Sequence, residues 1–137
     1  MKKIPAKNIY IGDYGWHKGR FHFSFGDYFD PENMRYGVLE ALNDFELQPG
    51  TGFEPHLHEE MEIVSYCVEG ELTHTDNMGN KTSIKRGDVQ YICAGSGIIH
   101  SEMNNNNYPL RFLQIWILLN QVITMFIVQF PPPYPPC

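Results

Sequence analysis

The stretch that decides the fold is ELTHTDNMGNKTSI, residues 71–84 of a 137-residue chain. On both sides of its centre, apolar or β-branched residues alternate with polar ones, as they do in strands that bury one face. The centre itself, Asn77-Met78-Gly79-Asn80, contains residues that tolerate positive φ and so favours a tight turn. Residues 71–84 therefore predict a β-hairpin.

The same kind of pattern continues on both sides of this hairpin. Short apolar or alternating runs, separated by turn residues, predict strands at residues 21–25, 37–42, 62–68, 89–93, 98–100 and 110–117. Helical periodicity is almost absent, so long crossover helices are not expected. About eight to eleven short strands in one domain of this length indicate an all-β fold, an antiparallel double-sheet barrel or jelly roll.

Composition and charge exclude several classes of function. The chain has a net charge of -6, and its ten basic residues do not gather into a patch, so we expect no direct contact with DNA or RNA. The basic start, Met1 to Lys7, is not followed by the apolar stretch that a secretory signal needs, so we expect a cytoplasmic protein. Residues 121–130 are apolar but too short for a convincing membrane span, and we expect no membrane partner.

Two pairs of metal-ligand residues carry the chemistry of this sequence. His56-Leu57-His58 and His100-Ser101-Glu102 each place two ligand residues at positions i and i+2. Residues two apart on an extended strand point to the same face, so the members of each pair can converge on one point. Three imidazoles and one carboxylate suit Fe(II), Mn(II), Ni(II), Cu(II) or Zn(II), and the remaining coordination positions are open to water, O2 or a chelating substrate.

Other reactive or aromatic residues are interpreted as structural. Cys67 and Cys93 lie in apolar runs and are expected to be small buried core residues. His17, His22 and His74 are expected to face solvent rather than to bind a metal. The aromatic residues of the amino-terminal segment are expected to form core and barrel cover; they are Trp16, Phe21, Phe23, Phe25 and Tyr28.

Four segments together closely resemble one known family. They are Gly52–Tyr66, Glu69–His74, Gly87–Gln90 and Ala94–Glu102, and they resemble the pirin family of the cupin superfamily over a region from Ile9 to Ile117. The resemblance implies a cupin-type antiparallel double-stranded β-helix that carries one metal ion. It implies metal ligands at His56, His58, His100 and Glu102, with Fe(II) as the first choice and Mn, Ni, Cu or Zn as alternatives.

The fourth ligand has a competitor. Many cupins take their carboxylate from a position shortly after the H-x-H motif, which here is Glu62. We favour Glu102, because it shares a strand face with His100.

The resemblance also predicts how the chain is organised. Residues 1–120 are expected to form a pirin-like amino-terminal cupin domain, a single barrel, whereas a pirin-like protein has a second cupin domain of similar size. Residues 121–137 are apolar and then proline-rich, and they are expected to form a tail rather than a second domain. A single barrel would expose the face that its missing partner covers, so we expect a homodimer that buries this face.

Two roles of different classes follow from the resemblance. The first is a metal-dependent oxidoreductase, a quercetin 2,3-dioxygenase that opens flavonols, with Glu102, or Glu62 if it is free, as the base that takes the proton of the 3-hydroxyl group. The second is a non-catalytic regulator whose binding of a protein partner depends on its metal or redox state. A third reading is a truncated, inactive remnant that still folds around a metal. We favour the dioxygenase by a small margin.

Overall fold

The chain folds almost entirely into β-structure. The computed structural model describes residues 3–119 and 126–130. Within these residues one short 3-10 turn, η1 (Ala6–Asn8), precedes eleven strands. The strands are β1 (Tyr10–Asp13), β2 (His17–Phe21), β3 (Leu39–Leu47), β4 (Gly52–His58), β5 (Met61–Glu69), β6 (Glu71–Asp76), β7 (Lys81–Lys85), β8 (Val89–Cys93), β9 (Ile98–Met103), β10 (Leu110–Leu118) and β11 (Phe126–Phe130).

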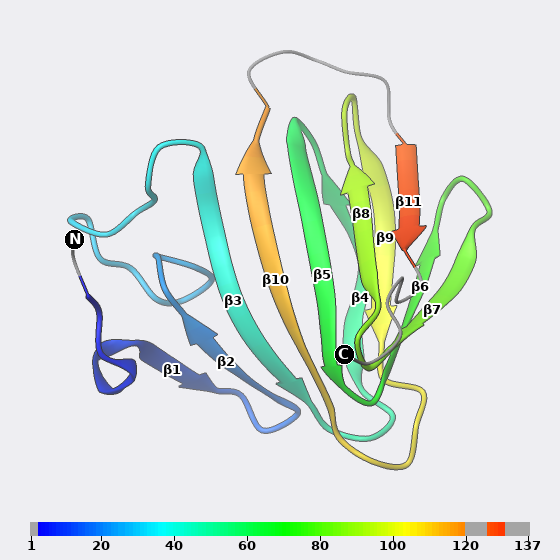
Figure 1. Cartoon of the computed structure of the whole chain (residues 1–137), viewed down its shortest axis with the longest axis horizontal. Coiled ribbons are helices and arrows are strands. Elements are labelled where there is room, and N and C mark those ends of the chain that lie inside the picture. Colours follow the sequence, from blue (N-terminus) through cyan, green and yellow to red (C-terminus); the bar gives the residue numbers. More distant parts are fainter. Residues whose placement is uncertain (1–2, 120–125, 131–137) are drawn as a thin grey trace, which may run out of the picture.

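The strands form two antiparallel sheets, one behind the other in Figure 1. The larger sheet has the order β1-β2-β3-β10-β5-β8-β11, and the smaller has the order β4-β9-β6-β7. Neighbours in these orders are often distant in sequence, as expected when a chain alternates between the two sheets of a jelly roll. The predicted double-sheet antiparallel fold is therefore confirmed. Among the described residues, no helix is long and apolar enough to cross a membrane.

The predicted hairpin is formed by β6 and β7. Its turn is held by the carboxylate of Asp76, which accepts hydrogen bonds from the backbone N–H groups of Met78 at 2.9 Å and Asn80 at 3.0 Å. Gly79 adopts a φ of 87°, a region that glycine enters at little cost. The local turn chemistry that predicted the hairpin thus also immobilises the Asp76 side chain.

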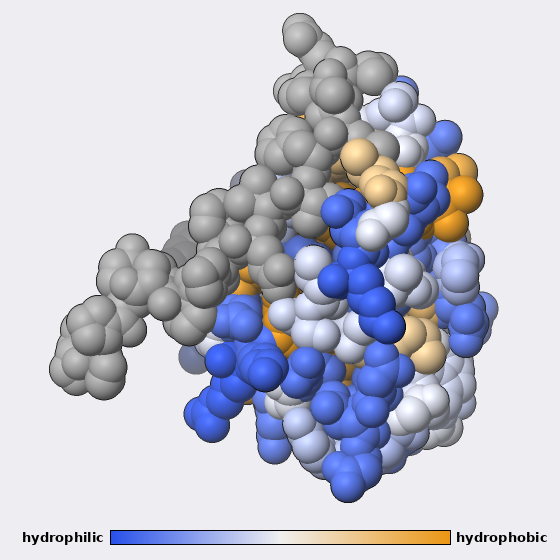
Figure 2. All heavy atoms as spheres, turned by 90° about the vertical axis from the view of Figure 1, so that its right-hand side faces the viewer, coloured by the Kyte–Doolittle hydropathy of each residue, from blue (hydrophilic) through white to orange (hydrophobic). Residues whose placement is uncertain are grey.

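The core consists of two clusters of apolar side chains between the sheets. The larger contains Phe21, Phe45, Leu47, Cys67, Leu72, Ile84, Leu110 and Phe112, with Phe25 and Phe53 packed against it. The smaller contains Ile63, Ile92, Ala94 and Ile98, with Met61 and Trp116 packed against it. Both Cys67 and Cys93 are fully buried, as predicted. On the face shown in Figure 2, most described side chains are hydrophilic and the hydrophobic ones form small separate patches.

Two strand predictions in the first third of the chain need correction. Residues 21–25 do not form a strand, because β2 ends at Phe21 and the hydroxyl of Ser24 instead bonds within the following loop, to the carbonyl oxygen of Asp30 at 2.9 Å. Strand β3 continues beyond residue 42 to Leu47, through the buried polar residues Asn43 and Asp44. Asp44 is tolerated there because Arg111 of β10 donates two hydrogen bonds to its carboxylate, at 2.9 and 2.8 Å.

Candidate metal centre

The pairing of β4 with β9 brings the two ligand motifs together. In this ladder His56 lies opposite His100, and Phe53 lies opposite Glu102. The register shifts between Phe53 and His56, where β4 carries a bulge. The ligand nitrogen atoms of His56, His58 and His100 all lie within 4.8 Å of one another. The prediction that these three imidazoles converge from two segments is therefore supported by the geometry.

The three imidazole rings enclose a small space of their own. The ring centroids of His56 and His100 are 4.5 Å apart, those of His56 and His58 are 4.8 Å apart, and those of His58 and His100 are 4.9 Å apart. Among the described residues, the buried Nε2 atoms of His58 and His100 have no hydrogen-bond partner. A buried polar atom without a partner is costly, and a metal ion bound between these nitrogens would satisfy both. The residues present therefore fit a transition-metal ion.

The charge state of these histidines also suits a metal. Burial, reinforced by the neighbouring His56, lowers the pKa of His58 to about 4. Burial and the adjacent histidines lower the pKa of His100 to about 2. Both imidazoles are consequently neutral at pH 7, and a neutral imidazole is the form that ligates metals.

Two of the ligand rings are oriented by hydrogen bonds on their far side. Nδ1 of His56 lies 2.7 Å from the carbonyl oxygen of Glu54. Because a carbonyl oxygen can only accept, Nδ1 of His56 carries the proton and Nε2 offers its lone pair. Nδ1 of His100 lies 3.2 Å from Nδ1 of His74, whose Nε2 lies 3.0 Å from the Oδ2 atom of Asp76.

The expectation that His74 and His17 face solvent is wrong. His74 is 1% exposed and His17 is 7% exposed. His74 lies on β6, two residues after the fully buried Leu72, so the alternation of that strand places both side chains on the inner face. That alternation was visible in the sequence and was the signal that could have identified His74. His17 occupies an inward position of β2, like Phe21, and its ring packs against those of Tyr14, Trp16 and Phe53.

Glu102 is buried beside the histidines but is held by a different partner. Its side chain is 1% exposed, and burial raises its pKa. Nε2 of Gln114 donates to both carboxylate oxygens, at 2.8 and 2.9 Å. The hydroxyl of Ser65 donates to Oε1 at 3.5 Å. Glu102 is not part of the group whose ligand atoms lie within 4.8 Å of one another, so its role as fourth ligand stays a prediction.

The competing ligand, Glu62, lies elsewhere. On β5 the inward positions are Ile63 and Ser65, which are both buried. Glu62 differs from Ser65 by three positions and therefore lies on the opposite face of the sheet. There its carboxylate accepts a hydrogen bond from the hydroxyl of Tyr91 at 2.8 Å. The geometry does not support Glu62 as a ligand of this centre.

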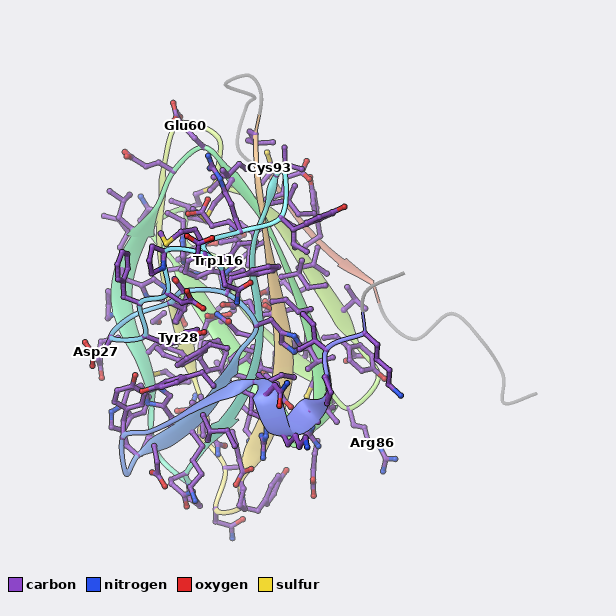
Figure 3. The ribbon with its side chains drawn as sticks, turned by 90° about the vertical axis from the view of Figure 1, so that its left-hand side faces the viewer. Asp27, Tyr28, Glu60, Arg86, Cys93 and Trp116 are labelled. Atoms are coloured by element: carbon purple, nitrogen blue, oxygen red, sulfur yellow. The ribbon has the colours of Figure 1, made fainter. Side chains whose placement is uncertain are left out.

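A cavity of about 240 Å³ opens next to the histidines. Its lining is mostly aromatic and consists of Phe25, Phe45, Phe53, His56, Glu102, Gln114 and Trp116. Figure 3 shows Trp116 in the interior of the ribbon, below the end at which Glu60 and Cys93 lie. Its ring centroid is 4.8 Å from that of His58, and its indole N–H donates to Oε1 of Gln114 at 3.0 Å. Aromatic side chains interpreted from sequence as barrel cover thus also shape a cavity at the metal centre.

The sequence did not predict that Gln114 belongs to the site. It is a buried amide in strand β10, whose other residues apart from Arg111 are apolar, and it connects Trp116 to Glu102. An uncharged polar residue inside a strongly apolar run was the signal that could have identified it.

Comparison with known proteins agrees with this geometry. A family model described as Pirin matches residues 5–117. A pirin-like protein of Caulobacter vibrioides is 51% identical over 117 residues, which are 85% of this chain and 50% of that protein. A protein of Escherichia coli K12 named quercetin 2,3-dioxygenase is 41% identical over 107 residues, which are 77% of this chain and 46% of that protein.

A solved structure gives the same result. The crystal structure of the bacterial pirin YhhW from Escherichia coli in complex with nickel(II) matches with a TM-score of 0.87 at 37% identity, covering 91% of this chain and 55% of that one. The chain spans about half the length of the curated relatives it matches. Because the family model matches well over half of its residues, the chain belongs to the pirin family.

Proposed function

We propose that this chain is a metal-binding cupin domain that contributes to a quercetin 2,3-dioxygenase-type oxidation of flavonols. The observation that carries the proposal is the set of three converging histidines, two of which have unpartnered buried Nε2 atoms, placed at an aromatic cavity. The relative from Escherichia coli that is named quercetin 2,3-dioxygenase supports the choice of substrate class. Since the chain corresponds to about half of that relative, the activity is proposed for the site and tested on this chain.

His56, His58 and His100 would hold the metal ion, and we propose Fe(II) as the ion. When bound, such an ion supplies a Lewis acid for a deprotonated flavonol oxygen and a site for reaction with O2. A donor set of three imidazoles suits nickel, copper, manganese and zinc as well as iron, so the metal is a separate measurement. The nickel(II) in the structure of the related pirin supports a divalent transition metal in this family fold.

The cavity provides the groups that would bind and deprotonate a flavonol. The rings of Phe25, Phe53 and Trp116 offer apolar faces to a planar polyphenol and keep bulk water away from it. Burial raises the pKa of Glu102 and so makes its carboxylate a stronger base for the proton of the 3-hydroxyl group. Gln114 donates to both oxygens of Glu102 and thereby holds the base in one orientation.

The decisive experiment measures metal content and turnover on the same preparations. After loading with Fe(II), we expect about one equivalent of metal in the parent, and little in a His56→Ala/His58→Ala double variant, by elemental mass spectrometry. A His22→Ala variant is the matched control, since His22 lies outside the metal centre, and it should keep its metal. Quercetin consumption under air is then followed in all three.

Each outcome separates the candidate roles. The proposal is supported if the parent and the His22→Ala control bind metal and consume quercetin, while the double variant does neither. Metal binding without turnover of any flavonol contradicts the enzymatic part and favours the non-catalytic, metal-dependent regulator. Absence of metal from the reloaded parent contradicts the metal function as a whole and favours the inactive remnant.

A further inference from the structure

The third ligand, His100, has an unusual partner. A histidine binds a metal through a nitrogen that carries no proton, and the hydrogen bond at its other nitrogen decides which nitrogen that is. For His56 the partner is a carbonyl oxygen, which can only accept. For His100 the partner is another imidazole nitrogen, Nδ1 of His74 at 3.2 Å, which can either accept or donate. The contact between the two rings does not by itself determine where the proton of His100 lies.

Asp76 removes this ambiguity. Its side chain is 0% exposed, and its Oδ2 atom lies 3.0 Å from Nε2 of His74, whose side chain is 1% exposed. The Oδ1 atom accepts hydrogen bonds from the backbone N–H groups of Met78 and Asn80, as described for the β6–β7 turn. An ionised carboxylate can only accept, so Nε2 of His74 must donate to it. When His74 carries its proton at Nε2, its Nδ1 presents a lone pair, and Nδ1 of His100 donates to that lone pair.

This chain of hydrogen bonds leaves the buried Nε2 of His100 without a proton, facing the other two ligands. We propose that Asp76, acting through His74, is a positioning device that fixes His100 in the tautomer able to bind a metal. The proposal rests on the proposed metal function and deepens it, because neither Asp76 nor His74 touches the metal. The sheet builds the device directly, since Asp76 lies opposite His100 in the pairing of β6 with β9.

An isosteric substitution of Asp76 should reverse the tautomer of His100. In an Asp76→Asn variant the backbone N–H groups of Met78 and Asn80 keep the amide oxygen at the position of Oδ1. The amide nitrogen then occupies the position of Oδ2, where it must donate to Nε2 of His74, and the Asn80 amide, which donates to Oδ2 in the parent, has to rotate away from it. The proton of His74 moves to Nδ1 and is donated to Nδ1 of His100. His100 consequently carries its proton on Nε2, where it blocks metal binding.

The test combines two measurements. Nitrogen-15 NMR of the imidazole rings reports the tautomer of His100 in the metal-free protein, and competition with a chromophoric chelator reports the affinity for zinc, a diamagnetic probe ion. We expect a protonated Nδ1 in the parent, a protonated Nε2 in Asp76→Asn, and zinc affinity about 10-fold to 100-fold lower in that variant. A His74→Leu variant should lose affinity similarly, because it leaves Nδ1 of His100 without its acceptor.

An Asn80→Ala variant is the matched control. It removes hydrogen bonds that the Asn80 amide donates to Asp76 in the same turn but leaves the carboxylate in place, so the tautomer and the affinity should stay as in the parent. Equal tautomers and equal affinities in parent and Asp76→Asn would overturn the proposal. So would an Asn80→Ala variant that reproduces the whole effect, since turn structure would then be its cause. A parent that binds no zinc overturns the metal function instead, while the metal-free spectra still decide whether Asp76 sets the tautomer.

Discussion

The histidines of the candidate metal centre make the metal-free fold sensitive to acid. The pKa of His58 is lowered to about 4 in the folded chain, against an ordinary value near 6.5 in the unfolded chain. Between these values the unfolded chain binds the proton and the folded chain does not, so the free energy of unfolding falls as the pH drops from about 6.5 towards 4. Urea unfolding of the metal-free protein at pH 7 and pH 5 measures this loss.

A His58→Gln variant serves as the control for this pH dependence. Removal of one such group should flatten the decline between pH 7 and pH 5, because fewer groups then differ in proton binding between the two states. An unchanged slope in the variant would show that other groups, such as the buried His17, cause the decline.

A single substitution of Glu102 tests its proposed role as the base. In a Glu102→Gln variant the side chain keeps its size but is a much weaker base. We expect quercetin turnover to fall about 100-fold or more, in the range that general-base catalysis contributes. Steady-state kinetics on metal-loaded protein measures it, with metal content determined in parallel. A fall in metal content would assign Glu102 to the ligand set, and unchanged turnover would remove it from both roles.

The residues of the candidate centre that are related by local spacing could be predicted from sequence, whereas those related only by contacts between distant strands could not. His56, His58 and His100 were predicted because the i, i+2 spacing is local and a strand converts it into a shared face. Gln114 acts on Glu102 from another strand, and no local pattern in the sequence reports that contact.

At the scale of the element, the pairing of β4 with β9 is the structure on which the centre depends. A Cβ atom added at Gly52 would overlap the carbonyl oxygen of Glu102 and lie 2.6 Å from the Cα atom of Met103, both on β9. Backbone cannot move aside as a flexible side chain can, so a Gly52→Ala variant must push the two strands apart. We expect a loss of about 1–3 kcal/mol in stability and weaker metal binding.

A Gly12→Ala variant is the control for this prediction. Gly12 lies on β1, at the far end of the larger sheet, and the added Cβ would meet only side chains, the ring of Tyr14 at 2.7 Å and that of Phe21 at 3.1 Å, rather than backbone. Its metal affinity should equal that of the parent in chelator competition. Equal metal affinity in Gly52→Ala would contradict the role assigned to close β4–β9 packing.

The strands that could be predicted from sequence are those whose pattern is uninterrupted. Residues 89–93 were predicted with the bounds that β8 has. Strand β3 was cut short because Asn43 and Asp44 look like turn residues, whereas Asp44 is neutralised by Arg111, 67 positions away. An ion pair between residues so distant in sequence leaves no periodic signal in either strand.

At the scale of the whole molecule, the homodimer and the assignment of residues 121–137 to a tail stay predictions. The backbone of β11 (Phe126–Phe130) pairs with β8, and the rest of residues 121–137 lie outside the described residues. Leu57 and Ile99 lie opposite each other on β4 and β9 and are 55% and 45% exposed. We expect a dimer in sedimentation velocity at micromolar concentration and a shift to monomer in a Leu57→Asp/Ile99→Asp variant, because charged side chains oppose apolar burial. A parent that sediments as a monomer would contradict the prediction.

The bulge in β4 has a further consequence for the whole site. From Phe53 to His56 the chain advances three residues, while its partner β9 advances two, from Glu102 to His100. The extra residue changes the parity of the strand, so Phe53 and His56 both line the cavity although they are an odd number of positions apart. Deleting Pro55 would remove this extra residue and place Phe53 and His56 two positions apart, so that normal alternation would still turn Phe53, His56 and His58 to the cavity, on a ladder without the bend that a bulge gives a strand.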